Sequence, residues 1–317
     1  MAFIHEDKEF ADIVGIVASE TGIGRALIEK DYWVVHTLWA LHSGAFDVWF
    51  KGGTSLSKGF GLIQRFSEDL DLKVVPRELT DAPAVHWKGD KPQHIASRKA
   101  WYRRLSARLV VPGTDVVLDE ASWSPEGLDP KARGVELLVH YPERHLAELG
   151  RHNVPSVKLE LGDARVTPFV VAPVSSFIHD WLAARSALAQ FTDNRPAAVR
   201  HVHPWVTLIE KLDAISRRYA RTEFDPARFV RHYEDAARIV LADLPAPDGY
   251  TREALIDVVM AGRPLPTEDD PALVLADPRK RDELEAAYDA LAGMYWGERQ
   301  SLAGACAVLR EWVRVGR

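Results

Sequence analysis

The chain has 317 residues, of which 47% are hydrophobic and 27% are charged, and its formal net charge is −6. These values are ordinary for a folded globular protein with one large domain or two smaller ones. They exclude a surface that attracts polyanions everywhere, so a nucleic-acid partner would need a local basic patch.

Cysteine content and the N-terminus suggest a compartment. The one cysteine, Cys306, excludes an internal disulfide framework and suits a reducing environment. Residues 1–7 show neither a basic lead nor an apolar run, so no signal peptide is expected. No stretch approaches the roughly 18 apolar residues of a membrane span. We therefore expect a cytoplasmic protein without a membrane partner.

The first elements alternate between helix and strand. Apolar residues recur at helical spacing over residues 10–17 and again over residues 24–42, which predicts two helices. A short strand over residues 48–50 then runs directly into Lys51-Gly52-Gly53-Thr54-Ser55. Two glycines after an apolar strand indicate a turn whose backbone closely approaches another group.

Residues 67–75 alternate between polar and apolar, which is the period of a half-buried strand. This alternation places Ser67, Asp69, Asp71 and Lys73 on one face and the apolar residues on the other. Further strands are expected near residues 115–118, 134–140 and 156–161. Residues 93–110 are expected to form a helix with five basic side chains: Arg98, Lys99, Arg103, Arg104 and Arg108.

From Pro204 onward every strong pattern is helical. The alternating strands and helices are expected to end near residue 180, with a boundary at roughly 175–200 and a linker at Asn194-Arg195-Pro196. The predicted fold is α/β (α+β). It comprises a core domain with a mixed sheet, residues 1–190, and a helical C-terminal domain, residues 200–317.

The strongest chemical signal is the Gly52-Gly53 turn followed by a strand bearing Asp69-x-Asp71. Carboxylates at i and i+2 of a strand point the same way and can hold one or two Mg²⁺ (or Mn²⁺) ions. Backbone N–H groups of the turn can bind a triphosphate. The pattern favours phosphoryl-type transfer from a nucleoside triphosphate (NTP), and the alternative is a surface hairpin with two solvated aspartates.

A third carboxylate is expected if two metal ions are held. In the strand near residues 156–161, Lys158 and Glu160 share a face. Glu160 is therefore a candidate metal ligand, and a cross-strand ion pair is the competing interpretation.

Charged residues of the C-terminal helices form a second candidate group. Lys211 and Arg218 are two helical turns apart on one face and could contact triphosphate oxygens. Asp225 is a credible N-cap before Pro226, and Asp235 lies in the helix that follows. From the residues alone, Lys211 and Asp235 are more simply interpreted as solvated helix charges.

The glycine turn and the Asp-x-Asp strand resemble the signature of the nucleotidyltransferase superfamily. Fifteen residues separate Gly53 from Asp69, a longer gap than is usual for that signature. Five longer blocks of the sequence resemble the AbiEii/AbiGii family, which uses this longer gap. The blocks that carry this resemblance are 29–33 (EKDYW), 50–58 (FKGGTSLSK), 65–72 (RFSEDLDL), 208–215 (LIEKLDAI) and 231–235 (RHYED). The resemblance covers roughly residues 25–310, with nothing recognisable over 76–150.

This resemblance implies a nucleotidyltransferase toxin of a bacterial abortive-infection or toxin–antitoxin system that acts in phage defence, with a cognate antitoxin as partner. It implies Lys211 as a catalytic lysine and Asp235 as a further acid, beside the catalytic metal ligands Asp69 and Asp71. The expected nucleotide-binding residues are Lys51, Gly52, Gly53, Ser55, Arg65, Ser67 and Arg218. RNA, at the 3′ end of tRNA, is the first acceptor expected from the resemblance, and protein the second.

Three other interpretations remain open at this stage. An enzyme of the same fold could modify a small molecule, the site could sense nucleotide without transferring it, or the chain could be a purely structural interaction protein. If RNA is the acceptor, the basic helix around residues 98–108 is the best candidate surface, and the alternative is a basic helix that faces solvent or pairs with acidic loops.

Overall fold

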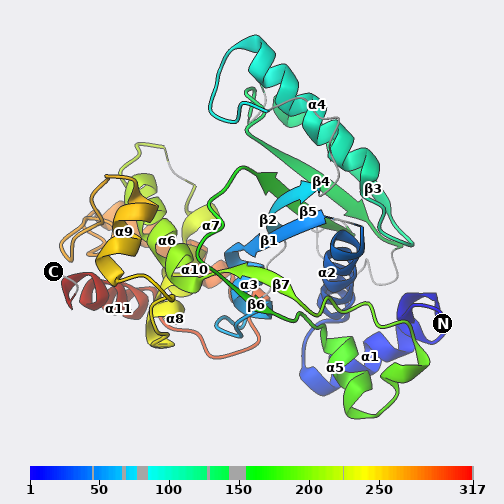
Figure 1. Cartoon of the computed structure of the whole chain (residues 1–317). Coiled ribbons are helices and arrows are strands. Elements are labelled where there is room, and N and C mark those ends of the chain that lie inside the picture. The colour runs from blue at the N-terminus through cyan, green and yellow to red at the C-terminus, as the bar shows by residue number, and fades with distance from the viewer. Residues whose placement is uncertain are drawn as a thin grey trace. The chain divides into compact units, whose positions relative to one another are not determined.

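The computed structural model describes residues 1–44, 46–65, 69–76, 85–126, 129–142, 155–223 and 225–315 (Figure 1). The strands are β1 Phe46–Lys51, β2 Asp69–Pro76, β3 Asp115–Asp119, β4 Gly134–His140, β5 Ser156–Gly162, β6 Phe169–Ala172 and β7 Val199–Val202. The helices are α1 Phe10–Thr21, α2 Arg25–Ser43, α3 Gly52–Lys58, α4 Pro92–Arg108, α5 Phe177–Ala184, α6 Pro204–Tyr219, α7 Pro226–Phe229, α8 Arg231–Leu241, α9 Arg252–Met260, α10 Pro278–Ala290 and α11 Leu302–Val315. Of the expected site residues, Ser67 lies outside the described residues.

The strands form one seven-stranded sheet in the order β3-β4-β5-β2-β1-β7-β6. Neighbours β3 and β4, β4 and β5, and β1 and β2 are antiparallel, whereas β2 pairs parallel with β5 and β1 pairs parallel with β7. The sheet is therefore mixed, and the predicted α/β (α+β) class is confirmed. The parallel pairing brings β5 beside β2 although β3 and β4 come between them in the chain.

The two central strands have one apolar and one polar face. Leu70, Leu72 and Val74 of β2 are buried, and the residues between them are half-buried. In β1, every second residue from Phe46 to Phe50 is buried in the same way. This alternation confirms the expected strand, and it places Asp69 and Asp71 on its polar face. Helix α2 packs against β1 and β5 and in turn contacts α1 and α5.

The expectation that strands end near residue 180 is wrong, because β7 lies at Val199–Val202 and pairs with β1. The interpretation of residues 194–196 as a linker is also wrong. Asn194 is fully buried, and its side chain bonds to His36, His179 and Tyr32. Such a buried polar network needs every partner in place, so this segment belongs to the packed core.

Helix α4 forms as expected and lies alongside β3 (Figure 1). Its basic side chains do not form one open surface, and the pairing of Arg103 agrees with the alternative that the helix pairs with acidic loops. Arg98 is fully buried and donates hydrogen bonds to backbone carbonyls, including those of Lys131 and Gly89. Arg103 forms a two-point ion pair with Glu120. Arg98 therefore stabilises the fold, because its donors satisfy carbonyls of two loops.

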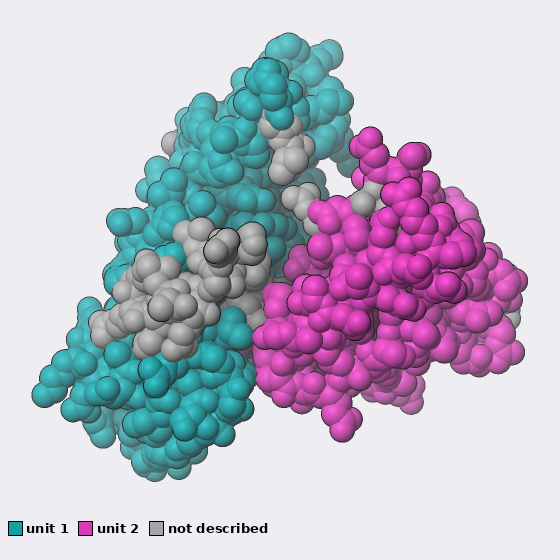
Figure 2. Space-filling view, turned by 180° about the vertical axis from the view of Figure 1, so that it is seen from behind, with its two compact units in different colours: residues 1–54, 67–166, 171–201 teal, residues 55–66, 167–170, 202–317 magenta. Residues whose placement is uncertain are grey.

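The chain divides into two compact units, which Figure 2 colours separately. The first unit contains residues 1–54, 67–166 and 171–201, and the second contains residues 55–66, 167–170 and 202–317. The short segment 55–66 leaves the first unit midway through α3. Its residues Leu56 and Ile63 are buried in the apolar core of the second unit.

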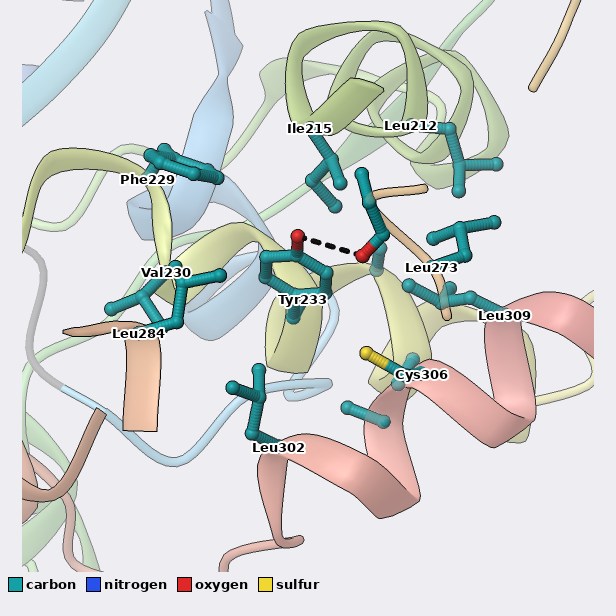
Figure 3. Packing of buried hydrophobic residues seen from close by; sticks show 14 of the residues in the cluster. Leu212, Ile215, Phe229, Val230, Tyr233, Leu273, Leu284, Leu302, Cys306 and Leu309 are labelled. Carbon is teal, nitrogen blue, oxygen red and sulfur yellow. Dashed lines mark hydrogen bonds between the residues drawn. The ribbon is translucent and has the colours of Figure 1, made fainter. Parts of the chain in front are cut away.

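The core of the second unit is built on α6, α8 and α11. Figure 3 shows Tyr233 of α8 surrounded by apolar side chains such as Leu212, Leu273 and Leu309. The Tyr233 hydroxyl donates a hydrogen bond of 3.0 Å to the Ala272 carbonyl, which satisfies the one polar atom that this ring brings into the core. Cys306 is buried here as a small apolar residue, and burial raises the pKa of its thiol to about 12.

Candidate functional site

Charged side chains form a row across the polar face of the sheet in the first unit. Strand register aligns Lys51 of β1 with Asp71 of β2, Asp71 with Glu160 of β5, and Glu160 with Glu136 of β4. The neighbouring row pairs Asp69 with Lys158. Three carboxylates on adjacent strands repel one another unless a cation lies among them.

Lys158 supplies such a cation. Its Nζ lies 2.8 Å from Glu160 Oε1, 3.2 Å from Asp69 Oδ1 and 3.5 Å from Glu136 Oε1. Partial burial of Lys158 by itself lowers its pKa, but the carboxylates of Glu160, Asp69 and Glu136 outweigh burial and raise it. The ammonium is therefore charged at neutral pH and joins β2 to β5.

The glycine turn comes into contact with Asp71. Gly52 has a φ of +73°, and a Cβ added there would lie 2.8 Å from Asp71 Cγ and overlap its Oδ2. The hydroxyl of Thr54 donates a hydrogen bond of 2.7 Å to the Asp69 carbonyl. The start of α3 is thus fixed against β2, and the close approach that two glycines predicted is to one of the two aspartates.

A pocket of about 350 Å³ in the first unit opens beside this row. Its walls include Lys51, Asp71, Glu136 and Glu160 from the sheet. Ser122, Asp129 and Asp163, which directly follows β5, also line it. Ligand sites are concave with a few convergent polar groups, so the row of charged side chains lies where a small ligand could bind.

The donor set of this region fits a hard divalent cation. Asp69, Asp71 and Glu160 offer carboxylate oxygens from two adjacent parallel strands, and such oxygens are the ligands that Mg²⁺ prefers. The absent side chain of Gly52 leaves room for the Asp71 carboxylate. Among the described residues, however, no three His, Cys, Asp or Glu side chains form a group able to hold a metal as they stand. Lys158 is bonded to two of the three candidate ligands instead.

The second unit contains a buried ion-pair cluster around Asp235. Arg65 binds this carboxylate at two points, with Nε to Oδ1 at 2.8 Å and Nη2 to Oδ2 at 2.7 Å. Lys211 Nζ donates to Oδ2 at 2.8 Å. Asp235 is fully buried, and Arg65 and Lys211 are 3% and 8% exposed. Lys211 and Asp235 are therefore not the solvated helix charges that the residues alone suggested.

Burial and neighbouring charges shift the pKa values of Asp235 and Lys211 in opposite directions. Burial raises the pKa of Asp235, but Arg65 and Lys211 outweigh burial and hold it well below its usual range. The pKa of Lys211 is lowered, because burial favours the neutral amine more than Asp235 favours the ammonium. Two basic side chains converge on one carboxylate, an arrangement that suits an anionic ligand.

His232 lies between Lys211 and Arg218. Lys211 Nζ lies 3.2 Å from His232 Nδ1, and Arg218 Nη1 lies 3.4 Å from Nε2. Burial, together with the charge of Lys211, lowers the pKa of His232 well below its usual value. A neutral imidazole has one ring nitrogen that accepts, so it can accept from Lys211 or from Arg218 but not from both. The expected placement of Lys211 and Arg218 on one helix face is confirmed.

The remaining expected residues lie within these elements. Lys51 ends β1 and is half-buried, Gly53 follows Gly52 in α3, and Ser55 is 1% exposed in the same helix. Asp225 caps α7 as expected, with its side chain accepting from Ala227 N.

Sequence reasoning missed three side chains of these clusters. Glu136 belongs to the region where no resemblance was recognised, and only strand register aligns it with Glu160. Lys158 was noted as a neighbour of Glu160, but not as a partner of Asp69. His232 stands within the quoted block 231–235, where its position next to an expected site residue was the available signal.

A mixed sheet with a glycine turn against an Asp-x-Asp strand, followed by a helical unit, defines an α+β protein of the nucleotidyltransferase type. Residues 39–309 match the family described as "Nucleotidyl transferase AbiEii toxin, Type IV TA system". The chain belongs to this family, and it is therefore a nucleotidyltransferase related to toxins of toxin–antitoxin systems. None of the curated proteins compared with the chain matches it. The family implies a nucleotide substrate and an antitoxin partner.

One finding bears on membranes. Across the described part of the chain, every helix is too short or too polar to cross a bilayer.

Proposed function

We propose that the protein transfers a nucleoside monophosphate from an NTP to an acceptor hydroxyl, with Mg²⁺ or Mn²⁺ as cofactor. The observation that carries this proposal is the position of Asp71, which shares the polar face of β2 with Asp69 and lies against the Gly52 backbone. A phosphoryl-type transfer needs a metal site and a phosphate-binding turn close together, and these residues supply both.

In this proposal Asp69, Asp71 and Glu160 would hold the metal, which would supply positive charge beside the phosphates of the NTP. The backbone of Gly52 and Gly53 binds phosphate oxygens. Further nucleotide contacts are proposed for Lys51, Ser55 and Ser67.

The second cluster is proposed to supply positive charge for the nucleotide. Lys211 and Arg218 neutralise phosphate charge, and Asp235 fixes the position of Lys211. Arg65 is nearly fully buried and is bonded to Asp235. The proposed role of Arg65 is therefore to hold Asp235 in place, and through it Lys211, for nucleotide binding.

For the acceptor we propose RNA, with the 3′ end of tRNA first. Membership of a toxin family supports a cellular macromolecule as target. The basic helix α4 supports it less than its composition suggested, because Arg98 is buried and Arg103 is paired with Glu120. A cytoplasmic location is proposed because one cysteine suits a reducing compartment.

The test is to incubate the full chain with each labelled NTP, total cellular RNA and Mg²⁺, and then to identify the labelled product. The same assay is run on Asp69→Asn and Asp71→Asn, each of which replaces one proposed metal-binding carboxylate with an amide of similar size. Losing one metal ligand should lower transfer on the order of 10³-fold or more, while circular dichroism shows that the fold is kept. Turnover like that of wild type in either variant would refute the metal assignment. Label in protein or in a small molecule would refute the RNA acceptor alone.

A further inference from the structure

The polar face of the sheet carries more carboxylates than the proposed reaction assigns. Glu136, Glu160 and Asp71 lie side by side on β4, β5 and β2, with Asp69 in the next row of β2. Glu136 and Glu160 are 38% and 40% exposed, and Asp69 is 18% exposed. Partial burial strengthens their mutual repulsion relative to bulk water, so the sheet needs a counter-charge here whether or not a metal ion is present.

The position of Lys158 shows what this counter-charge does. Lys158 stands on β5, the strand between β4 and β2, and its ammonium bonds to Glu160 and Asp69. These are two of the three carboxylates to which the proposed function assigns the metal. A divalent ion and an ammonium group cannot both bind the same carboxylate oxygens at close range, because both are cations and repel each other.

We propose that Lys158 is a built-in competitor of the divalent metal: it joins Asp69 to Glu160 while no metal is bound, and it must give up Asp69, together with any Glu160 oxygen that the metal takes, before the metal can bind. This inference rests on the proposed function, since it concerns the same carboxylates. Lys158 is thereby a positioning residue, which keeps the ligand strands in register and sets the metal affinity.

Glu136 offers the displaced Lys158 ammonium an alternative ion-pair partner. It lies on β4, on the opposite side of β5 from Asp69, and its Oε1 is already 3.5 Å from Lys158 Nζ. A small rotation of the lysine side chain toward β4 would exchange Asp69 for Glu136 without leaving the charge unpaired. Glu136 therefore favours metal binding, although it does not itself hold the metal.

Mn²⁺ binding to the full chain, measured by calorimetry without nucleotide, tests this inference. Lys158→Met removes the competitor, so Mn²⁺ should bind about tenfold more tightly than to wild type. Lys158→Arg keeps the charge and should stay close to wild type. Glu136→Gln removes the alternative partner and should weaken Mn²⁺ binding a few-fold. Unchanged or weaker binding by Lys158→Met would overturn the inference.

Lys73→Met is the matched control for charge alone. Lys73 lies on the same sheet face and is 25% exposed, against 29% for Lys158, but its ion pair is with Asp163. Its removal should change Mn²⁺ affinity much less than removal of Lys158. Equal effects of the two substitutions would show a general charge effect and overturn the specific competition.

Two further measurements distinguish failure of the Lys158 inference from failure of the metal assignment. If Asp69→Asn abolishes Mn²⁺ binding but Lys158→Met leaves it unchanged, the inference fails and the metal assignment stands. If wild type and Asp69→Asn bind Mn²⁺ alike, or neither binds it, the metal assignment fails and the inference with it. Lys158→Met should also melt at a lower temperature than wild type without Mn²⁺ and show the larger rise on Mn²⁺ addition. Equal rises would count against the inference.

Discussion

At the scale of single residues, the approach of Gly52 to Asp71 is the contact on which the candidate site most depends. The sequence pattern predicted a glycine turn that approaches another group, and the structure identifies this group as the Asp71 carboxylate. A side chain at residue 52 would meet two separate penalties, the positive φ and the overlap with Asp71. Gly22 offers a comparison, because its φ is +72° and nothing lies within 4 Å of an added Cβ.

Gly52→Ala should therefore lower nucleotide transfer on the order of 100-fold, since a ligand carboxylate displaced by about 1 Å loses catalytic geometry. Gly22→Ala meets only the backbone penalty, about 1 kcal/mol, and should keep its activity. Steady-state transfer rates and urea unfolding of both variants would check this. Equal activity in the two variants would show that the Gly52–Asp71 approach does not matter to the reaction.

At the scale of elements, Asp235 holds three segments of the second unit together. It stands on α8 and binds Lys211 of α6 and Arg65 of the segment 55–66. Sequence analysis named all three residues for nucleotide chemistry, but it could not show that they are mutual partners. Arg65 and Lys211 are 170 and 24 residues away from Asp235 in the chain. Helical periodicity carries no information across such separations.

Asp235→Asn should destabilise the protein by about 3–5 kcal/mol, because Arg65 and Lys211 remain buried without their counter-charge. Urea unfolding at neutral pH measures this. Glu311→Gln is the control, since Glu311 is 58% exposed and its ion pair with Arg314 should contribute less than about 1 kcal/mol. Adding Lys211→Met to Asp235→Asn should restore part of the loss. A stability of Asp235→Asn within about 1 kcal/mol of wild type would contradict this account.

At the scale of the whole molecule, buried histidines make the free energy of unfolding depend on pH. Burial lowers the pKa of His179 to about 4 and that of His201 to about 4, from the ordinary 6.5. Both side chains are fully buried. His179 lies in the network with Ser176 and Asn194, and His201 lies in β7 beside Phe50. Each is neutral in the folded protein, whereas the unfolded chain takes up a proton below about pH 6.5.

The free energy of unfolding should therefore fall as the pH is lowered from about 6.5 to about 4. Each histidine accounts for about 3 kcal/mol over that window, because one pKa unit corresponds to about 1.4 kcal/mol and the unfolded state binds more protons. Urea midpoints measured between pH 7 and pH 4 would follow this loss. His179→Gln should flatten the dependence, and an unchanged slope would show that His179 is not one of the groups responsible.

The sequence alone determined the faces on which side chains lie and the family resemblance, because both depend on local periodicity and short sequence motifs. The two-residue period of a strand is enough to put Asp69 and Asp71 on one face, and the period of a helix is enough to align Lys211 with Arg218, two turns further on. The resemblance to the AbiEii family rested on short blocks of sequence, and the family match confirmed it.

Tertiary structure alone decided which of these residues meet. Strands β2 and β5 are neighbours in the sheet although β3 and β4 lie between them in the chain, and this pairing places Lys158 beside Asp69. Arg98 belongs to a basic helix by sequence, yet the carbonyls of two distant loops draw it into the interior. The reason is physical: a backbone period fixes the direction of a side chain within its own element, whereas its partner depends on which elements pack together to bury apolar surface.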